Sequence, residues 1–229
     1  MGSRHGTRER LLAAARDLLI QDGAAAVTMR AVATRVGLSA MAPYRHFPSR
    51  EALLAAVVEQ SHAVFASHLQ RALAAPTPEE RLLQAGFEYL NFALEHPRDY
   101  ALMLMNAPPE SEAASASRGR DRATFQFLVD RIRECADAGV LDAPDPELTA
   151  LTVWGHVHGI VSLHLTRRLF VDDRTLREVY ARALGALARG LGWRSKTIAD
   201  PAGRLRAGGI SPVFTAHTRS STRSKGGLS

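Results

Sequence analysis

The apolar residues of this chain recur at intervals of three and four positions, the spacing of one face of an α-helix. No stretch of any length alternates apolar and polar residues in the way that a half-buried strand would. The pattern therefore predicts an all-α protein. The expected helices, about nine, span residues 7–21, 29–36, 40–46, 50–73, 78–95, 100–105, 118–139, 146–168 and 173–191.

Capping residues mark several of these boundaries. Thr28 and Ser49 precede two of the helices, where a hydroxyl oxygen can accept from a free backbone amide. Thr77 precedes a third, and the proline and two glutamates that follow it suit a first helical turn. Gly37 suits the end of the second helix. A loop rich in Pro, Ser and Ala is expected over 107–117.

The segment from Gly37, "GLSAMAPYRHFPSREALL", predicts a helix-turn-helix. Two short helices meet at Gly37, and the second of them, capped by Ser39, would be the recognition helix that enters the major groove of DNA. Pro43 lies within that helix. As the fourth helical residue it removes only the first intrahelical hydrogen bond, so we expect the helix to tolerate it.

Residues 8–54 resemble the head of TetR-type transcriptional regulators. Thr28 and Arg30 match the start of the second helix, "GLS" the turn, "YRHF" the family's Tyr-x-His-Phe, and "SREALL" the start of the fourth helix. Pro43 departs from the leucine that most members carry. The resemblance implies a three-helix DNA-binding head joined by a long helix to a helical-bundle domain that binds a ligand and dimerises.

The residue types agree with the roles that the resemblance implies. Tyr44 and Arg50 can bind phosphates, and Arg30 and Arg45 can read guanine. Small or apolar residues can meet thymine methyl groups, and the amides after Thr28 can hold a phosphate. A solvated surface arginine is the alternative for Arg45. The expected DNA-binding residues are Thr28, Arg30, Ser39, Ala40, Met41, Tyr44, Arg45 and Arg50.

A second resemblance lies in "LTVWGHVHGIVSLHL", residues 151–165. Trp154, His158 and Gly159 resemble the Trp-His-Gly signature of a C-terminal domain found in TetR-type proteins. Trp154 and His158 share one helix face, and Gly155 and Gly159 make a smooth stripe. The resemblance implies that the last two helices pair with their copies into a four-helix bundle in a homodimer.

An apolar ligand cavity is predicted between the helices of this second part, with His158 as a polar anchor. Ordinary packing in a helical core is the alternative for each lining residue. The expected ligand-binding residues are Phe87, Leu90, Met103, Phe125, Trp154 and His158. The histidines at 156, 158 and 164 do not predict a metal site, because His156 and His158 point to different sides of a helix. We expect neither a metal nor another cofactor.

Composition narrows the class of protein. A single cysteine excludes a disulfide framework, and no run of 18 apolar residues predicts a membrane span. A cytoplasmic protein is expected. The first fifty residues hold eight arginines and three acidic residues, whereas 51–193 hold more acidic than basic residues. A basic head on an acidic body suits a protein that meets DNA at one end.

The sequence thus predicts a helix-turn-helix domain over 1–50, a ligand-binding and dimerisation domain over 51–193, and a disordered basic tail over 194–229. The expected function is a homodimeric repressor that binds a palindromic double-stranded DNA operator and is released by a small apolar ligand. Two alternatives remain open. One is a sequence-independent DNA-packaging protein, and the other is an enzyme with an appended DNA-binding head. No catalytic arrangement is visible, so a non-enzyme is expected.

Overall fold

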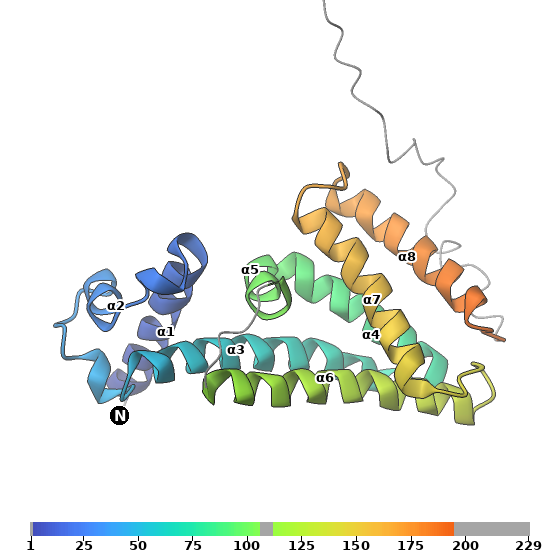
Figure 1. Cartoon of the computed structure of the whole chain (residues 1–229), viewed down its shortest axis with the longest axis horizontal. Coiled ribbons are helices and arrows are strands. Elements are labelled where there is room, and N and C mark those ends of the chain that lie inside the picture. The colour runs from blue at the N-terminus through green and yellow to red at the C-terminus, as the bar shows by residue number, and fades with distance from the viewer. Residues whose placement is uncertain (1, 106–111, 195–229) are drawn as a thin grey trace, which may run out of the picture.

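The computed structural model describes residues 2–105 and 112–194, with side chains over 6–105 and 122–194. These residues form eight α-helices and no strand, which confirms the all-α class (Figure 1). The α-helices are α1 (Gly2–Asp22), α2 (Met29–Arg35), α3 (Arg50–Arg71), α4 (Pro78–Glu95), α5 (Pro97–Tyr100), α6 (Glu112–Asp137), α7 (Pro146–Leu165) and α8 (Asp173–Gly190). The short turns are η1 (Ala24–Ala26), η2 (Pro43–Arg45), η3 (Ala72–Ala74) and the π-helical η4 (Ala101–Met105).

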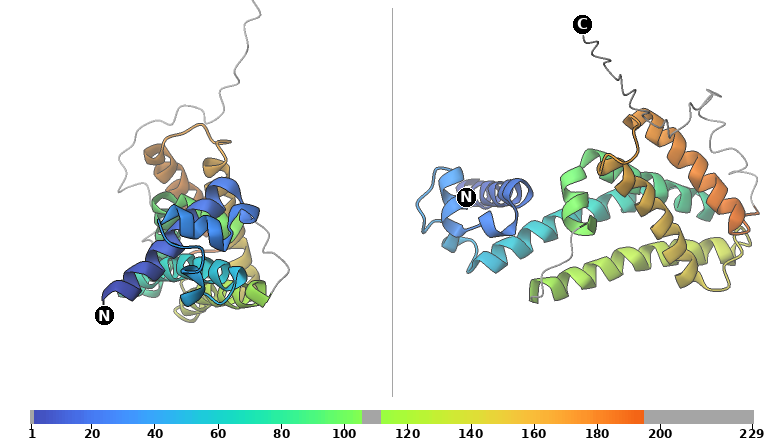
Figure 2. Two further views of the ribbon diagram at one scale, coloured as in Figure 1. Left: turned by 90° about the vertical axis from the view of Figure 1, so that its left-hand side faces the viewer. Right: turned by 45° about the horizontal axis from the view of Figure 1, so that its top comes forward.

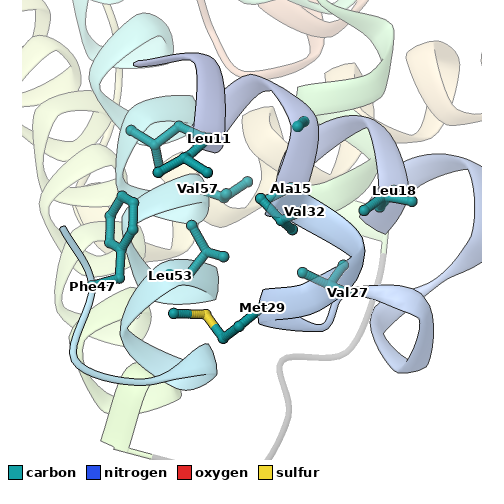
Figure 3. Close-up of a cluster of buried hydrophobic side chains, with 11 residues drawn as sticks. Leu11, Ala15, Leu18, Val27, Met29, Val32, Phe47, Leu53 and Val57 are labelled. Atoms are coloured by element: carbon teal, nitrogen blue, oxygen red, sulfur yellow. The ribbon is translucent and has the colours of Figure 1, made fainter. Parts of the chain in front are cut away.

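The head consists of α1, η1, α2 and η2, gathered around one end of the long helix α3 (Figure 1). Its core is a cluster of buried aliphatic side chains closed by Phe47 (Figure 3). Leu53 and Val57 of α3 are part of this cluster and are fully buried. The core of the head therefore extends past residue 50, where the sequence suggested that the head ends, and α3 belongs to both parts of the molecule.

The predicted caps hold these helices in place. The Oγ1 of Thr28 accepts from the amide of Ala31 at 3.1 Å, and the Oγ of Ser49 accepts from the amide of Ala52 at the same distance. Gly37 has a φ of +70°. This left-handed conformation lets the Leu38 amide reach back to the Ala33 carbonyl at 2.9 Å and ends α2 in a sharp turn.

The recognition helix expected over 40–46 is not an α-helix. The Ala42 amide donates to the Ser39 carbonyl at 2.9 Å, and one short turn, η2, follows from Pro43. Proline has no N–H with which to continue an α-helical ladder from Ser39, so the chain forms consecutive tight turns instead. Pro43 occupies the first position of η2, and its side chain is buried in the head.

The body packs α4 and α6 along the second half of α3, with α7 and α8 beyond them (Figures 1 and 2). Helix α6 begins at Glu112, earlier than the expected 118, because its alanine-rich start favours helix over loop. Of the expected loop 107–117, residues 107–111 lie outside the described residues. So does the predicted tail from 195 onward. No helix among the described residues is long and apolar enough to cross a membrane.

Candidate DNA-binding surface and ligand cavity

The predicted DNA-binding residues lie on the outside of the head. Seven of the eight are exposed, while Arg50 is half-buried. Met41 is 69% exposed and Tyr44 is 49% exposed, which is unusual for large side chains of this kind. Neither side chain is part of the core. The seven exposed residues are Thr28, Arg30, Ser39, Ala40, Met41, Tyr44 and Arg45.

The side chains of Arg30 and Arg45 have no hydrogen-bond partner among the described residues, unlike those of two other arginines of the head. Arg10 donates to the Val36 carbonyl at 2.7 Å, and Arg35 donates to Gln21 at 2.9 Å. No described residue accepts a hydrogen bond from the side chain of Arg30 or Arg45. Their guanidinium groups therefore keep all of their donors for a partner outside the chain.

Arg50 has a role in the head that the sequence did not reveal. Its Nε donates to the Val27 carbonyl at 2.6 Å, and its Nη2 donates to the Ala24 carbonyl. These bonds tie the first turn of α3 to the loop that leads into α2. Arg50 thus positions α2, and its contact with a DNA phosphate stays a prediction.

A cavity of about 540 Å³ lies inside the body among α3, α4, α6, α7 and α8. Met103, Phe125 and Trp154, three of the six predicted ligand-binding residues, line it. Most of the remaining wall is aliphatic or aromatic. Arg122, Thr124 and Tyr89 supply the polar side chains among the residues that line it.

The other three predicted residues, Phe87, Leu90 and His158, do not line the cavity. On α4 the wall is formed by Leu82, Leu83, Ala85, Gly86 and Tyr89, which lie on one broad side of the helix. The face that carries Phe87 and Leu90 packs into the core instead. Phe87 lies 6.2 Å from the ring of Tyr180 on α8, and Leu90 is fully buried.

His158 lies behind the cavity wall in a cluster of polar side chains. Its Nδ1 is 2.7 Å from the Tyr100 hydroxyl and 3.2 Å from that of Tyr89, and the two hydroxyls are 3.0 Å apart. Its Nε2 is 3.2 Å from Ser162 Oγ. Burial lowers the pKa of His158 and raises the pKa of Tyr100 to about 12. The cluster is therefore uncharged near neutral pH, and Tyr89 connects it to the cavity.

The shifted histidine predicts a pH dependence of stability. Because the folded pKa of His158 lies below its ordinary 6.5, the unfolded chain takes up a proton at a pH where the folded chain does not. The contribution of His158 to the free energy of unfolding is therefore fully present above pH 6.5. It is lost as the pH falls from 6.5 to the pKa of the folded state. His158→Gln should make the urea midpoint of unfolding depend less on pH between pH 7.5 and 5.5. Equal slopes for the parent and His158→Gln would contradict this.

A buried carboxylate joins the body to the head. Asp99 on α5 is 2% exposed, pairs with Arg16 of α1 and accepts from Ser61 Oγ of α3 at 2.6 Å. Leu102, in the turn that follows, packs against the core of the head. The sequence offered no sign of this junction, because Arg16 and Asp99 are 83 residues apart.

Comparison with known families finds two matches in order along the chain. Residues 11–57 match the family model for bacterial regulatory proteins of the tetR family. Residues 82–187 match the model for the tetracyclin repressor-like C-terminal domain, and this segment includes the Trp-His-Gly residues. No curated protein sequence matches the chain.

Solved structures show the same fold. A protein of unknown function from Rhodococcus sp. RHA1 is 29% identical, with a TM-score of 0.68 over 83% of this chain and 98% of that one. A tetR-family regulatory protein from Rhodococcus RHA1 is 21% identical, with a TM-score of 0.64 over 82% and 98% of the two chains. AibR, solved with isovaleryl coenzyme A and operator DNA, is 17% identical, with a TM-score of 0.63 over 82% and 99%.

The first matched segment holds the head with its helix-turn-helix, and the second holds most of the cavity wall. Their order along the chain is also the order of the two parts in the structure. The chain therefore belongs to the TetR family of transcription regulators.

Proposed function

We propose that this protein is a homodimeric repressor that binds a palindromic operator and leaves it when a small apolar ligand fills the cavity. One observation carries the proposal: a single helix, α3, builds both sites. Leu53 and Val57 at its start fill the core of the head, and Phe65 and Leu69 near its end line the cavity. A ligand that moves the second half of α3 also moves the head.

The exposed residues of the head support a role in reading DNA. Arg30 and Arg45 offer free guanidinium groups, which suit the N7 and O6 acceptors of guanine. Tyr44 offers a hydroxyl to a phosphate, and Met41 offers an apolar contact for a thymine methyl group. The basic excess of the first fifty residues favours approach to DNA.

The outer face of α7 supports a homodimer. Leu148 is 60% exposed and Leu151 52% exposed, and both lie on a helix that is otherwise largely apolar. A Cβ added at Gly155 or Gly159 would meet nothing within 4 Å, so another helix has room to approach. In a two-fold dimer the heads would read half-sites about 34–36 Å apart.

The cavity supports an apolar effector. Its volume of about 540 Å³ lies within the range of small-molecule sites, and its wall is mostly apolar. AibR, which has the same fold, was solved with both isovaleryl coenzyme A and operator DNA. Small-molecule binding and operator binding therefore occur together in one protein of this architecture.

The segment after α5 supplies a second path from the cavity to the head. Met103 and Leu104 line the cavity, and the adjacent Leu102 packs against the core of the head. A ligand that displaces Met103 or Leu104 pushes on the turn that also carries Leu102. If this turn takes one arrangement with ligand and another without it, it couples ligand binding to operator binding.

Binding to DNA duplexes selected by the protein from a random pool tests the proposal. Arg45→Ala should weaken binding to the selected duplex by about 1–3 kcal/mol and relax its base preference. Tyr44→Phe should weaken binding to selected and scrambled duplexes alike. Arg174→Ala, at an exposed position on α8, is the matched control and should change neither affinity.

Three outcomes would count against this function. Equal affinity of the parent protein for selected and scrambled duplexes would favour the sequence-independent DNA-packaging alternative. Equal losses on both duplexes for Arg45→Ala would remove its base-reading role. Turnover of a bound small molecule would instead favour the enzyme alternative.

A further inference from the structure

We propose that His68, Glu95 and His96 form a binding site for a divalent transition-metal ion such as Zn²⁺. His68 lies near the end of α3, Glu95 is the last residue of α4, and His96 forms the elbow between α4 and α5. The site lies apart from the cavity, since none of the three residues lines it. The proposal does not depend on the protein being a repressor.

The three side chains bring suitable donor atoms together. One ligand atom from each residue lies within 4.8 Å of the other two. The Nε2 of His68 is 3.8 Å from a carboxylate oxygen of Glu95. Two ligands of a tetrahedral Zn²⁺ are about 3.4 Å apart when each bond is about 2.1 Å. A small rotation of the exposed Glu95 side chain is enough to close the difference.

A buried carboxylate orients His68 for this role. The Nδ1 of His68 lies 3.2 Å from Glu88 Oε2, and both side chains are buried. When Nδ1–H donates to Glu88, the lone pair of Nε2 is directed toward Glu95 and His96. Histidines that bind metals commonly donate their other ring N–H to a carboxylate in this way. Arg71, 3.4 Å from the same Glu88 oxygen, balances its charge.

His96 has a comparable environment. Its Nδ1 lies 3.7 Å from an oxygen of Asp99. Its amide donates to the Phe92 carbonyl at 2.8 Å, and Pro97 follows at once, so the backbone of the elbow is held in place. Glu95 is largely exposed and leaves one side of the site open to water and to an entering ion. Three protein ligands and one open position match a four-coordinate ion.

The donor set selects the kind of ion. Two imidazoles and one carboxylate suit Zn²⁺, Co²⁺ or Ni²⁺, whereas Ca²⁺ and Mg²⁺ prefer sites built wholly from oxygen. An ion here would join α3 to the elbow between α4 and α5. Asp99, beside His96, is the residue that pairs with Arg16 of the head.

The sequence did not suggest this site. The histidines that lie close together in the sequence, within residues 151–165, are not part of the site. The structure places His158 against two tyrosines and His164 against Asp173 at 2.9 Å. His68 is separated from His96 by a helix turn and all of α4. Only the packing of α4 on α3 brings the two together.

Titration of the chelator-treated full-length protein with zinc chloride in a calorimeter tests the site. We expect one ion per chain, with micromolar or tighter affinity. Glu95→Gln and His96→Gln should each weaken binding at least tenfold. His164→Gln removes a histidine that also faces a carboxylate, but outside the cluster, and should leave the affinity unchanged.

Thermal melting gives a second readout that does not rely on heats of binding. Zinc chloride should raise the melting temperature of the parent and of His164→Gln, but not that of His96→Gln. Both variants replace partly exposed side chains and leave the buried His68 in place, so folding is retained. Absence of saturable binding at one ion per chain would overturn the proposal. Binding that survives both Glu95→Gln and His96→Gln would overturn it as well.

Discussion

Replacing Asp99 with alanine should lower the free energy of unfolding by about 2–3 kcal/mol, the cost of leaving partners of a buried charged group unsatisfied. Asp99 is almost fully buried, and its carboxylate holds both Arg16 and the hydroxyl of Ser61. Alanine removes both contacts and leaves the inner side of the Arg16 guanidinium without an anion. The head should then move more freely relative to the body.

Chemical unfolding monitored by circular dichroism measures this effect. Asp130→Ala is the matched control, because Asp130 forms an exposed pair with Arg133 at 3.6 Å on α6. Exposed pairs of this kind contribute about 0.2–1 kcal/mol, so the control should lose little. A double-mutant cycle that combines Asp99→Ala with Arg16→Met measures the interaction energy of the Arg16–Asp99 pair. Equal stability of Asp99→Ala and Asp130→Ala would show that the junction does not hold the head.

Leu151→Glu should convert the proposed dimer to a monomer at micromolar concentration. Leu151 is exposed on the apolar outer face of α7. On a two-fold axis the substitution places two carboxylates in one interface, where an unpaired charge has no solvent. A loss of about a hundredfold in dimer affinity corresponds to about 2.8 kcal/mol. Operator binding should fall with it, since each half-site then binds alone.

Sedimentation velocity measures whether the Leu151→Glu protein is a dimer or a monomer. Leu73→Glu is the control, because Leu73 is exposed to a similar degree but lies in η3, away from α7. It should sediment like the parent. A Leu151→Glu protein that remains a dimer would move the interface away from this face of α7. In that case the exposed leucines there would need another partner.

The local parts of the fold could be predicted from the sequence. Thr28, Ser49 and Thr77 each precede a helix that begins within one residue of the expected place. Their signal is local, because a hydroxyl satisfies an amide three residues ahead whatever the rest of the chain does. Gly37 ends α2 for a similarly local reason. The exposed positions of the head follow from these boundaries.

The parts that depend on distant contacts could not be predicted. Helix α4 carries apolar residues on more than one face, so its sequence did not reveal that Tyr89, and not Leu90, faces the cavity. Asp99 lies just before the expected helix 100–105, and nothing in the neighbouring sequence marks it as buried or paired. Its structural role depends on contacts with Arg16 and Ser61, which lie next to it only in the folded chain. Pro43 marks an unusual helix in the sequence, but the loss of one hydrogen bond does not predict the consecutive tight turns that the chain forms from Ser39 to Arg45.

The continuity of α3 makes operator geometry a matter of helical register. Each residue of an α-helix adds 1.5 Å of rise and 100° of rotation. One alanine inserted between Glu59 and Gln60, beyond the core of the head, would therefore swing the DNA-reading surface to another side of the body in each subunit. Seven inserted residues, about two turns, would restore its direction and set it about 10 Å farther out. In the proposed dimer, the length of this one helix would therefore set the spacing of the half-sites that the two heads can reach.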